Sequence, residues 1–397
     1  MIKIKRYYEL PEGEKVFNLY LFMAAMSMPF YPEDIFPDGF YYPDGITKTE
    51  LKSFPRSPRR RTKKYADLLT KKRMHFSSSL SSLSSTTFEP AEEDALLAEV
   101  LIKDYSTELH DFLYDGQTDG HVDPDALRIL LTTPVDNDSL KRYPKLFKVF
   151  ANAGSYKESS LLLENVFRYE AFTARAEIHT FVQSLGVDIC PYCNRLYITT
   201  ALRTKSASPV RPELDHYRSK SKYPFFALSI LNLVPSCSVC NHIKSDNEEE
   251  LLYPYGEGLD NDYMFQTEPT GGIIYLSGTR IPKEDFLISL KQKNLHMDPE
   301  KEERVKNSIN TLQLDSMYNA HREYVSDIMF QRYVFDDPMI QDLVRQFPGL
   351  FKDETEVRNM LLLMDISPSK WGNRPLSKLT HDISEELDEL YEAADSE

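Results

Sequence analysis

The sequence predicts an α+β fold that is mostly helical and that carries one small embedded unit of short strands. Two observations favour this fold class. Apolar residues recur at helical spacing over long stretches of the 397-residue chain, most clearly at 91–113, 161–185 and 299–335. All four cysteines instead fall within residues 190–245, beside a short strand-like stretch. We therefore expect helices arranged around a compact, cysteine-bearing unit.

The composition of the chain changes along its length and suggests three parts. Residues 1–155 form an N-terminal extension that includes a basic and serine-rich loop at about 52–90. Residues 156–250 hold the cysteine-bearing unit and its lead-in helix. Residues 251–397 begin with a hairpin, indicated by apolar runs on either side of Pro269-Thr-Gly-Gly272, and continue as helices. The basic run in the loop suits nucleic acid or an acidic partner, although a solvated surface is the alternative.

The distribution of charge separates one region from the rest. The whole chain carries a net charge of −15. This argues against a nucleic-acid-binding protein whose entire surface is positively charged. Residues 190–245, however, contain eight Lys and Arg against two acidic residues. A basic region in an acidic chain is typical of a cleft for a phosphate backbone. Accidental clustering of surface charges is the alternative.

The N-terminal residues give an expectation about location. The stretch at 1–15 lacks the apolar core of a signal peptide. The longest apolar run near it, 19–26, is too short to span a bilayer. We expect a soluble cytoplasmic protein without membrane contact, where paired cysteines are metal ligands more often than disulfides.

The cysteines form two Cys-x-x-Cys pairs, here called the first knuckle (Cys190 and Cys193) and the second knuckle (Cys237 and Cys240). Two such pairs can place four thiolates around one Zn²⁺ in a tetrahedron. No cysteine is left over, so the sequence predicts a structural zinc site. A redox pair or plain buried cysteines are the alternatives.

The residues between and beside the knuckles carry a family resemblance. Asp215-His216, then Asn232, then Asn241 directly after the last cysteine, occur in the order found in zinc-stabilised nucleases. The chain here resembles the HNH nuclease family. That resemblance implies a ββα-metal module, in which two strands and a helix surround one catalytic divalent ion.

The resemblance also implies a role for each residue. Asp215 and Asn241 would supply hard oxygen ligands, which favour Mg²⁺ or Mn²⁺. His216 would act as the general base on an attacking water, and Asn232 would fix the loop that carries it. The alternatives are a half-buried structural histidine at His216, a turn cap at Asn232, and His242 as a metal ligand.

Basic residues near this motif are candidates for contact with a nucleic-acid backbone. They are Arg218, Lys220, Lys222 and Lys244. Lys244 lies three residues beyond Asn241, so a helix would place both on one face.

A narrower resemblance covers roughly residues 160–390. The segments that carry it are Arg168–Phe172, Leu185–Arg195, Ser219–Ser229, Asn232–Cys237 and Arg374–Ile383. They resemble the HNH component of Septu and retron-associated anti-phage defence systems. This implies an endonuclease acting on DNA together with an ABC/SMC-like ATPase partner. An RNase of the same mechanism, for instance against tRNA, and a non-catalytic zinc-stabilised scaffold are the competing hypotheses.

Overall fold

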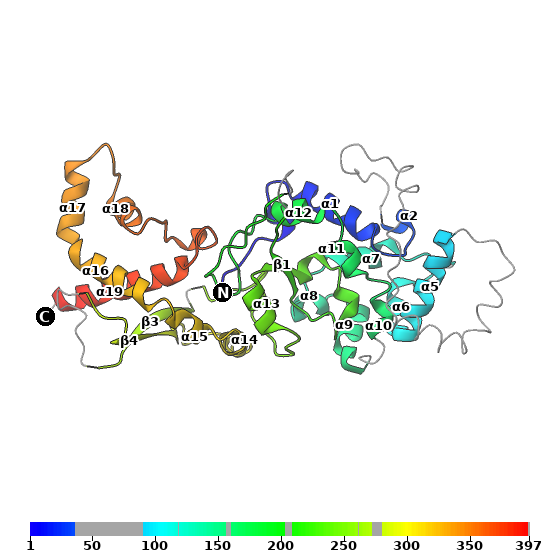
Figure 1. Cartoon of the computed structure of the whole chain (residues 1–397). Coiled ribbons are helices and arrows are strands. Elements are labelled where there is room, and N and C mark those ends of the chain that lie inside the picture. The colour runs from blue at the N-terminus through cyan, green and yellow to red at the C-terminus, as the bar shows by residue number, and fades with distance from the viewer. Residues whose placement is uncertain are drawn as a thin grey trace.

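A computed structural model of the chain describes residues 1–35, 90–117, 119–155, 160–202, 209–260, 262–271 and 280–395. It is an α+β structure, about half of it helical, which confirms the predicted class. In these ranges the strands form two separate two-stranded antiparallel sheets. The first sheet lies between the N-terminal and C-terminal helices (Figure 1). No helix in the described ranges is long and apolar enough to cross a bilayer. The predicted loop at about 52–90 lies outside the described residues, apart from its last position.

Short helices form the part of the molecule that precedes the first sheet. Ser106 interrupts the helix predicted at 91–113, because its Oγ accepts a hydrogen bond from the Leu109 amide (3.2 Å) and so begins a new helix. The elements are η1 (Tyr7–Glu9), α1 (Gly13–Ala25), α2 (Pro32–Ile35), α5 (Pro90–Tyr105), α6 (Thr107–Leu113), α7 (Pro124–Thr132), α8 (Asn137–Lys141) and α9 (Pro144–Ala151).

The helix predicted at 161–185 is in fact three short ones. They are α10 (Ser160–Leu163), α11 (Tyr169–Thr173) and α12 (Ile178–Ser184). The chain leaves the helical path at Arg168, whose Nε donates to the carbonyl oxygen of Ser27 (2.7 Å). Gly186 adopts a positive φ of 64° after α12 and directs the chain into the first knuckle.

The first sheet and the helix that follows it form a ββα unit, residues 213–244. Strand β1 (Glu213–His216) pairs antiparallel with β2 (Leu233–Ser236), so that Asp215 lies opposite Val234. Helix α13 (Ser238–Lys244) starts directly after β2. Two 3-10 turns join the strands, η3 (Pro224–Phe226) and η4 (Ile230–Asn232).

The second sheet pairs β3 (Tyr263–Pro269) with β4 (Phe286–Gln292). A hairpin is therefore present after residue 251, but its second strand is not the expected apolar run at 273–276. That run lies outside the described residues. The edge of β3 is held by the last helix, because Asp382 accepts a hydrogen bond from the Phe265 amide (3.0 Å).

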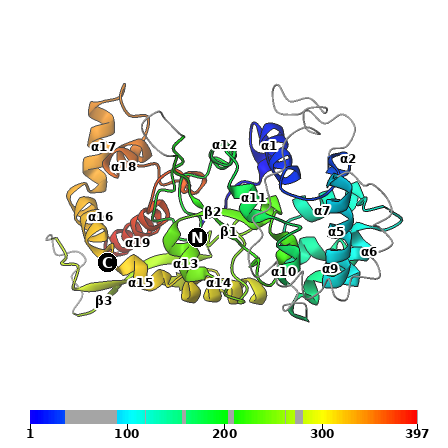
Figure 2. The same cartoon turned by 45° about the vertical axis from the view of Figure 1, so that its right-hand side comes forward.

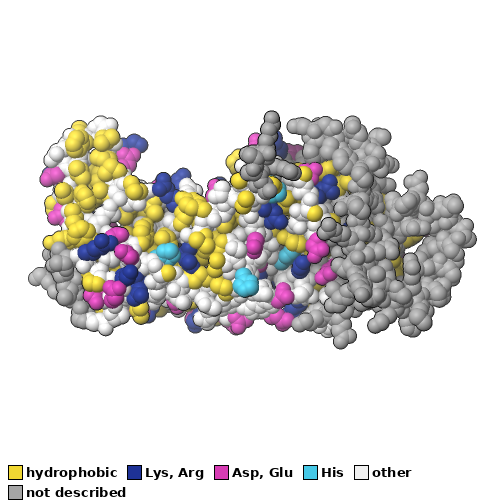
Figure 3. Space-filling view, in the orientation of Figure 1, with side chains coloured by type: hydrophobic (Ala, Val, Ile, Leu, Met, Phe, Trp, Pro, Cys, Tyr) yellow, Lys and Arg dark blue, Asp and Glu magenta, His cyan; other side chains and the backbone are white. Residues whose placement is uncertain are grey.

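The C-terminal helices follow the second sheet. They are α14 (Pro299–Thr311), α15 (Leu314–Asn319), α16 (Arg322–Val334), α17 (Asp337–Gln346), α18 (Glu354–Leu361) and α19 (Ser377–Asp395), with the turn η5 (Pro368–Lys370). Helices α17 and α18 stand away from the ββα unit (Figure 2). Hydrophobic side chains gather on the surface of this part (Figure 3), where Leu350 and Leu363 are 68% and 73% exposed.

The N-terminal residues pack onto the cysteine-bearing unit. The Ile2 amide donates to the carbonyl oxygen of Pro191 (2.9 Å), and Tyr20 Oη donates to that of Leu228 (2.6 Å). Buried side chains from Met1 onwards share one hydrophobic core with those of the ββα unit and of α19. The parts distinguished by composition are thus packed together around the first sheet.

Candidate active site and metal centre

The four cysteines meet in one buried cluster. Their Sγ atoms all lie within 4.8 Å of one another, and none forms a disulfide. In a tetrahedral Zn²⁺ site with bonds of about 2.3 Å, sulfur atoms are about 3.8 Å apart. Backbone amides reinforce the cluster, since the Cys237 amide donates to Cys190 Sγ (3.4 Å). The residues therefore fit a structural zinc ion, and the predicted ligand set is brought together.

The second knuckle also starts helix α13. Cys237 has an extended backbone and its side chain accepts a hydrogen bond from the Cys240 amide (3.4 Å), which makes it the N-cap. Asn241 and Lys244 follow on the same helix. A metal at the cysteines would thus fix the helix that carries both of these polar residues.

The first knuckle is held from its other side by the C-terminal region. Tyr318 Oη donates to the Cys193 carbonyl oxygen (2.5 Å). The next residue, Asn194, is 1% exposed and has a positive φ of 50°, which asparagine tolerates. Its Nδ2 donates to the Trp371 carbonyl oxygen (2.8 Å), and its Oδ1 accepts from the Lys378 amide (3.2 Å) in the first turn of α19.

Asp215 is 3% exposed and is surrounded by donors. Tyr192 Oη donates to its Oδ2 (2.5 Å). Lys244 Nζ lies 3.0 Å from Oδ2 and 3.2 Å from Oδ1. Burial raises the pKa of Tyr192 well above its usual value, and the adjacent carboxylate adds to the effect, so the phenol stays a proton donor.

His216 is half-buried at the end of β1. Its Nε2 lies 3.0 Å from the carbonyl oxygen of Ala227, which can only accept, so this nitrogen carries the proton. The lone pair is then on Nδ1. Burial lowers the pKa of His216 to about 4, and the positive charges of Lys220 and Lys244 contribute in the same direction. The neutral imidazole packs edge-on against Tyr169, with ring centroids 4.4 Å apart.

Asn232 is fully buried and holds the chain just after His216. Its Oδ1 accepts from the Arg218 amide (2.7 Å), and its Nδ2 donates to the carbonyl oxygens of Arg218 (3.1 Å) and Phe226 (3.0 Å). These three bonds join the two ends of the connection between β1 and β2. The side chain thereby fixes the path of the backbone that carries His216.

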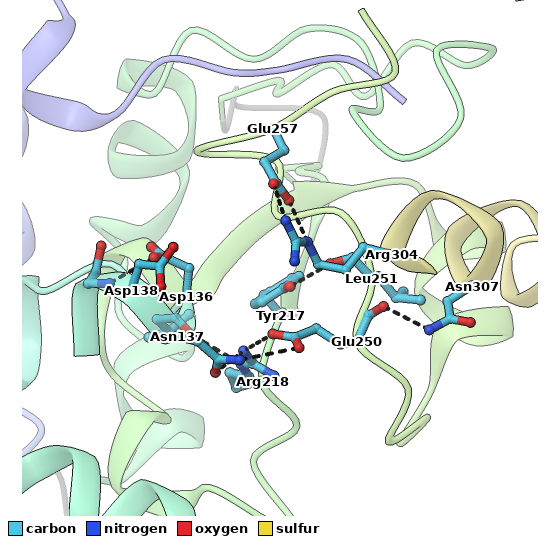
Figure 4. A network of polar contacts seen from close by, with 12 residues as sticks. Asp136, Asn137, Asp138, Tyr217, Arg218, Glu250, Leu251, Glu257, Arg304 and Asn307 are labelled. Atoms are coloured by element: carbon cyan, nitrogen blue, oxygen red, sulfur yellow. Dashed lines mark hydrogen bonds and ion pairs between the residues drawn. The ribbon is translucent and has the colours of Figure 1, made fainter. Parts of the chain in front are cut away.

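Arg218 occupies a different position from the one expected for a contact to nucleic acid. Its side chain is 11% exposed and its Nη2 donates to Glu250 Oε1 (2.7 Å). The same guanidinium reaches Asn137 Oδ1 (3.3 Å), which Figure 4 shows beside Glu250, and the carbonyl oxygen of Val135 (3.1 Å). Arg218 thus links α8, the β1–β2 connection and the chain after α13. Its positive charge is balanced by Glu250 within the protein.

Lys244 also differs from expectation, because its ammonium faces Asp215 and not the surface. Its side chain is 3% exposed, and Nζ donates to the His216 carbonyl oxygen (2.8 Å). Lys222 is more accessible and pairs with Glu248 (3.2 Å). Lys220 is half-buried, with Nζ 5.4 Å from the ring centre of Tyr169. Of the four basic candidates, Lys220 and Lys222 thus keep contact with solvent.

Asn241 lies on the outer side of the site. Its Nδ2 donates to Glu213 Oε2 (2.5 Å), which leaves Oδ1 as the atom suited to a cation. Glu213 is exposed and shares a face of β1 with Asp215. Asp215 and Asn241 thus have different partners, because the buried ammonium of Lys244 contacts both oxygens of Asp215 whereas Asn241 pairs with Glu213.

Two residues of this site escaped the sequence reasoning. Tyr192 belongs to no motif named above, although its position between two knuckle cysteines was a signal that it is rigidly held. Glu213 is one of the two acidic residues in the basic region 190–245 and carried no predicted role. Its place two residues before Asp215 in a strand was the available signal.

Comparison with known proteins gives no relative. No protein-family model matches the chain, and neither a curated protein nor a solved structure matches it.

Proposed function

We propose that this protein is a metal-dependent HNH endonuclease that hydrolyses phosphodiester bonds of DNA. The observation that carries the proposal is the ββα unit itself. Asp215 and His216 lie at the end of β1, Asn232 holds the connection to β2, and Asn241 follows on α13. The family resemblance of the sequence supports the same activity.

The chemistry follows from the donor atoms. Asp215 and Asn241 would hold a divalent ion, which would supply positive charge to the scissile phosphate and its leaving oxygen. His216 Nδ1 takes a proton from the attacking water, because Nε2 is occupied by Ala227. The lowered pKa keeps His216 unprotonated at neutral pH, although it also makes the imidazole a weaker base than one with a pKa near 7. The water oxygen bonds to phosphorus and the bond to the leaving oxygen breaks.

The resemblance to defence nucleases supplies the biological part of the proposal. It points to the effector of a bacterial anti-phage system that works with an ABC/SMC-like ATPase. No GxxxxGK[ST] loop occurs in the sequence, so the ATPase would be another chain. Co-purification of such a partner with the protein tests this part.

The decisive experiment compares wild type with His216→Ala on plasmid DNA and on total RNA, with Mg²⁺ or Mn²⁺ and then with EDTA. We expect wild type to cut DNA and EDTA to abolish cutting. We expect His216→Ala to be inactive and His242→Ala, which changes an exposed histidine of α13, to retain activity. Cutting of RNA alone would favour the RNase. Full biological activity of His216→Ala would favour the scaffold.

A further inference from the structure

We propose that Tyr169 is a positioning residue that holds the ammonium of Lys220 beside His216, so that Lys220 binds the phosphate on which His216 acts. This inference rests on the proposed nuclease function. It assigns the scissile phosphate to one lysine of the β1–β2 connection and gives the aromatic ring of Tyr169 the task of placing it.

The first step is the charge of the β1–β2 connection, which contains three cations. Two of them already have carboxylate partners. Arg218 donates to Glu250 (2.7 Å), and Lys222 Nζ donates to Glu248 (3.2 Å). Lys220 forms no ion pair with any carboxylate in the part of the chain that the structure describes. It is therefore the cation of this connection that can bind an anion without giving up an ion pair.

The second step is the place of this ammonium. Lys220 Nζ lies 5.4 Å from the centre of the Tyr169 ring, to which a cation is attracted. The imidazole of His216 packs edge-on against the same ring, with centroids 4.4 Å apart. Burial lowers the pKa of His216, and the charge of Lys220 acts in the same direction, as expected for an ammonium close to the imidazole. Lys220 is thus held next to the candidate base.

The third step is the rigidity of the ring. Tyr169 begins helix α11, and its Oη donates to the carbonyl oxygen of Leu214 (3.1 Å), which lies two residues before His216 on β1. Phe172, on the same helix, is fully buried in the core. The ring is therefore tied to the strand that carries the imidazole. Lysine has a flexible stem, so contact with a fixed ring limits the positions of the ammonium before a phosphate arrives.

The chemical consequence concerns the transition state. Attack of water on a phosphodiester places negative charge on the phosphate oxygens, and a positive charge fixed beside them lowers the barrier. Lys220 forms no covalent bond in this step and keeps its protons, since it only donates hydrogen bonds to a non-bridging oxygen. An ammonium held next to His216 contacts the phosphate that is attacked, and not a remote part of the backbone.

The first test measures binding of a labelled DNA duplex by fluorescence anisotropy over a series of salt concentrations, without added Mg²⁺ or Mn²⁺. One phosphate contact fewer lowers the slope of log affinity against log salt concentration by about 0.9, and we expect this change in Lys220→Met. Lys222→Met is the matched control. Its ammonium also lies over a tyrosine, 5.6 Å from the ring centre of Tyr223, but is paired with Glu248. We expect its slope to equal that of wild type.

The second test measures steady-state cleavage of the same duplex with Mg²⁺ or Mn²⁺ present. Loss of a group that stabilises charge in the transition state lowers kcat by about 100-fold, and we expect this loss in Lys220→Met. We expect Lys222→Met to keep the kcat of wild type. A rise in KM with unchanged kcat in Lys220→Met would place the contact on another phosphate and overturn the inference.

The role of Tyr169 is tested by Tyr169→Leu, which removes the ring, and by Tyr169→Phe, which keeps it. We expect Tyr169→Leu to bind the duplex about 5-fold more weakly, in line with the strength of a cation–π contact, and Tyr169→Phe to bind nearly as well as wild type. Adding Tyr169→Leu to Lys220→Met should leave the affinity unchanged, because the ring affects DNA binding through this lysine. A further loss in the double variant would contradict the positioning role.

The outcomes separate this inference from the proposed function. Equal effects of Lys220→Met and Lys222→Met on the salt slope and on kcat would overturn the inference while leaving the nuclease intact. A wild-type protein that neither binds nor cleaves DNA or RNA would overturn the proposed function itself. A lower slope and a lower kcat in Lys220→Met alone of the two lysine variants, with Tyr169→Leu silent in that background, would establish the inference.

Discussion

The ammonium group of Lys244 lies 3.0 Å from Asp215 Oδ2, and the two side chains are only 3% and 4% exposed. The same ammonium donates to the carbonyl oxygen of His216. One buried cation therefore contacts both members of the Asp-His pair. The sequence suggested Lys244 as a contact to a nucleic-acid backbone, whereas this pairing makes it part of the interior.

Replacing Lys244 by methionine should destabilise the protein strongly. The change leaves the carboxylate of Asp215 buried without its cation, which typically costs about 3–5 kcal/mol. Urea unfolding, measured by circular dichroism, gives the free energy of unfolding. Lys222→Met is the matched control, because Lys222 pairs with Glu248 near the surface and such pairs contribute about 0–1 kcal/mol. Equal losses in the two variants would contradict the role of the buried pair.

Mutation of one cysteine should remove the metal and the local fold together. We expect wild type to contain one zinc ion per chain by elemental analysis and Cys237→Ser to contain none. Since the free energy of zinc binding is also folding free energy, the variant should lose thermal stability and resistance to proteolysis around residues 190–245. Val239→Ser, at a 43% exposed position inside the same knuckle, should keep both. A folded, zinc-free Cys237→Ser protein would refute the structural role.

Asn232→Ala should lower both stability and cleavage. It removes three hydrogen bonds, one of them to the buried carbonyl oxygen of Phe226 and two to partly buried backbone groups of Arg218. Such groups cost about 1–3 kcal/mol each, so we expect a loss at the upper end of that range in chemical unfolding. Asn247→Ala, at a half-buried position beyond α13, should cost clearly less. If Asn232→Ala were as stable as wild type, the side chain would not be fixing the loop.

Glu386 should make stability depend on pH. Burial raises the pKa of this carboxyl to about 7, from an ordinary 4.5. The folded protein therefore retains the proton between these values while the unfolded chain releases it, so the free energy of unfolding falls as pH rises from about 4.5 to 7.

Glu386→Gln removes that titration and can still accept hydrogen bonds from Thr267. We expect the variant to gain stability relative to wild type between pH 5 and pH 8, on the order of 2 kcal/mol. Thermal unfolding at both pH values measures the difference. Glu385→Gln changes the neighbouring carboxylate, which pairs with Lys293, and should show no such gain. If Glu386→Gln differed from wild type by the same free energy of unfolding at pH 5 and at pH 8, this would contradict a raised pKa of Glu386.

Much of the metal centre could be predicted from sequence, because the two Cys-x-x-Cys pairs fix local geometry by their spacing alone. The order Asp215, His216, Asn232 and Asn241 likewise indicated neighbouring positions, and the structure brings these residues onto one ββα unit. Arg218 and Lys244 were misplaced for a common reason. Their direction depends on partners distant in sequence, such as Glu250 and Asp215, which only tertiary packing selects.

The secondary structure outside the ββα unit was predicted with less detail. Apolar periodicity located helices at 91–113 and 161–185 but did not reveal the breaks within them. One break depends on the Ser106 hydroxyl as a cap, and another on a contact between Arg168 and Ser27. The strand that pairs with β3 was also misplaced, because a turn motif marks where a chain can bend but not which segment returns to pair.

The hydrogen bond from the Lys378 amide to Asn194 Oδ1 spans 184 positions of the sequence. The first turn of α19 is therefore completed by a residue of the first knuckle, and Asn194 in turn has its polar atoms satisfied only once that turn has been synthesised. During translation, residues 190–245 leave the ribosome well before their last partners do. A fragment cut after residue 245 lacks the Trp371 and Lys378 partners of Asn194, so this fixed end of the first knuckle forms only in a chain that extends into α19.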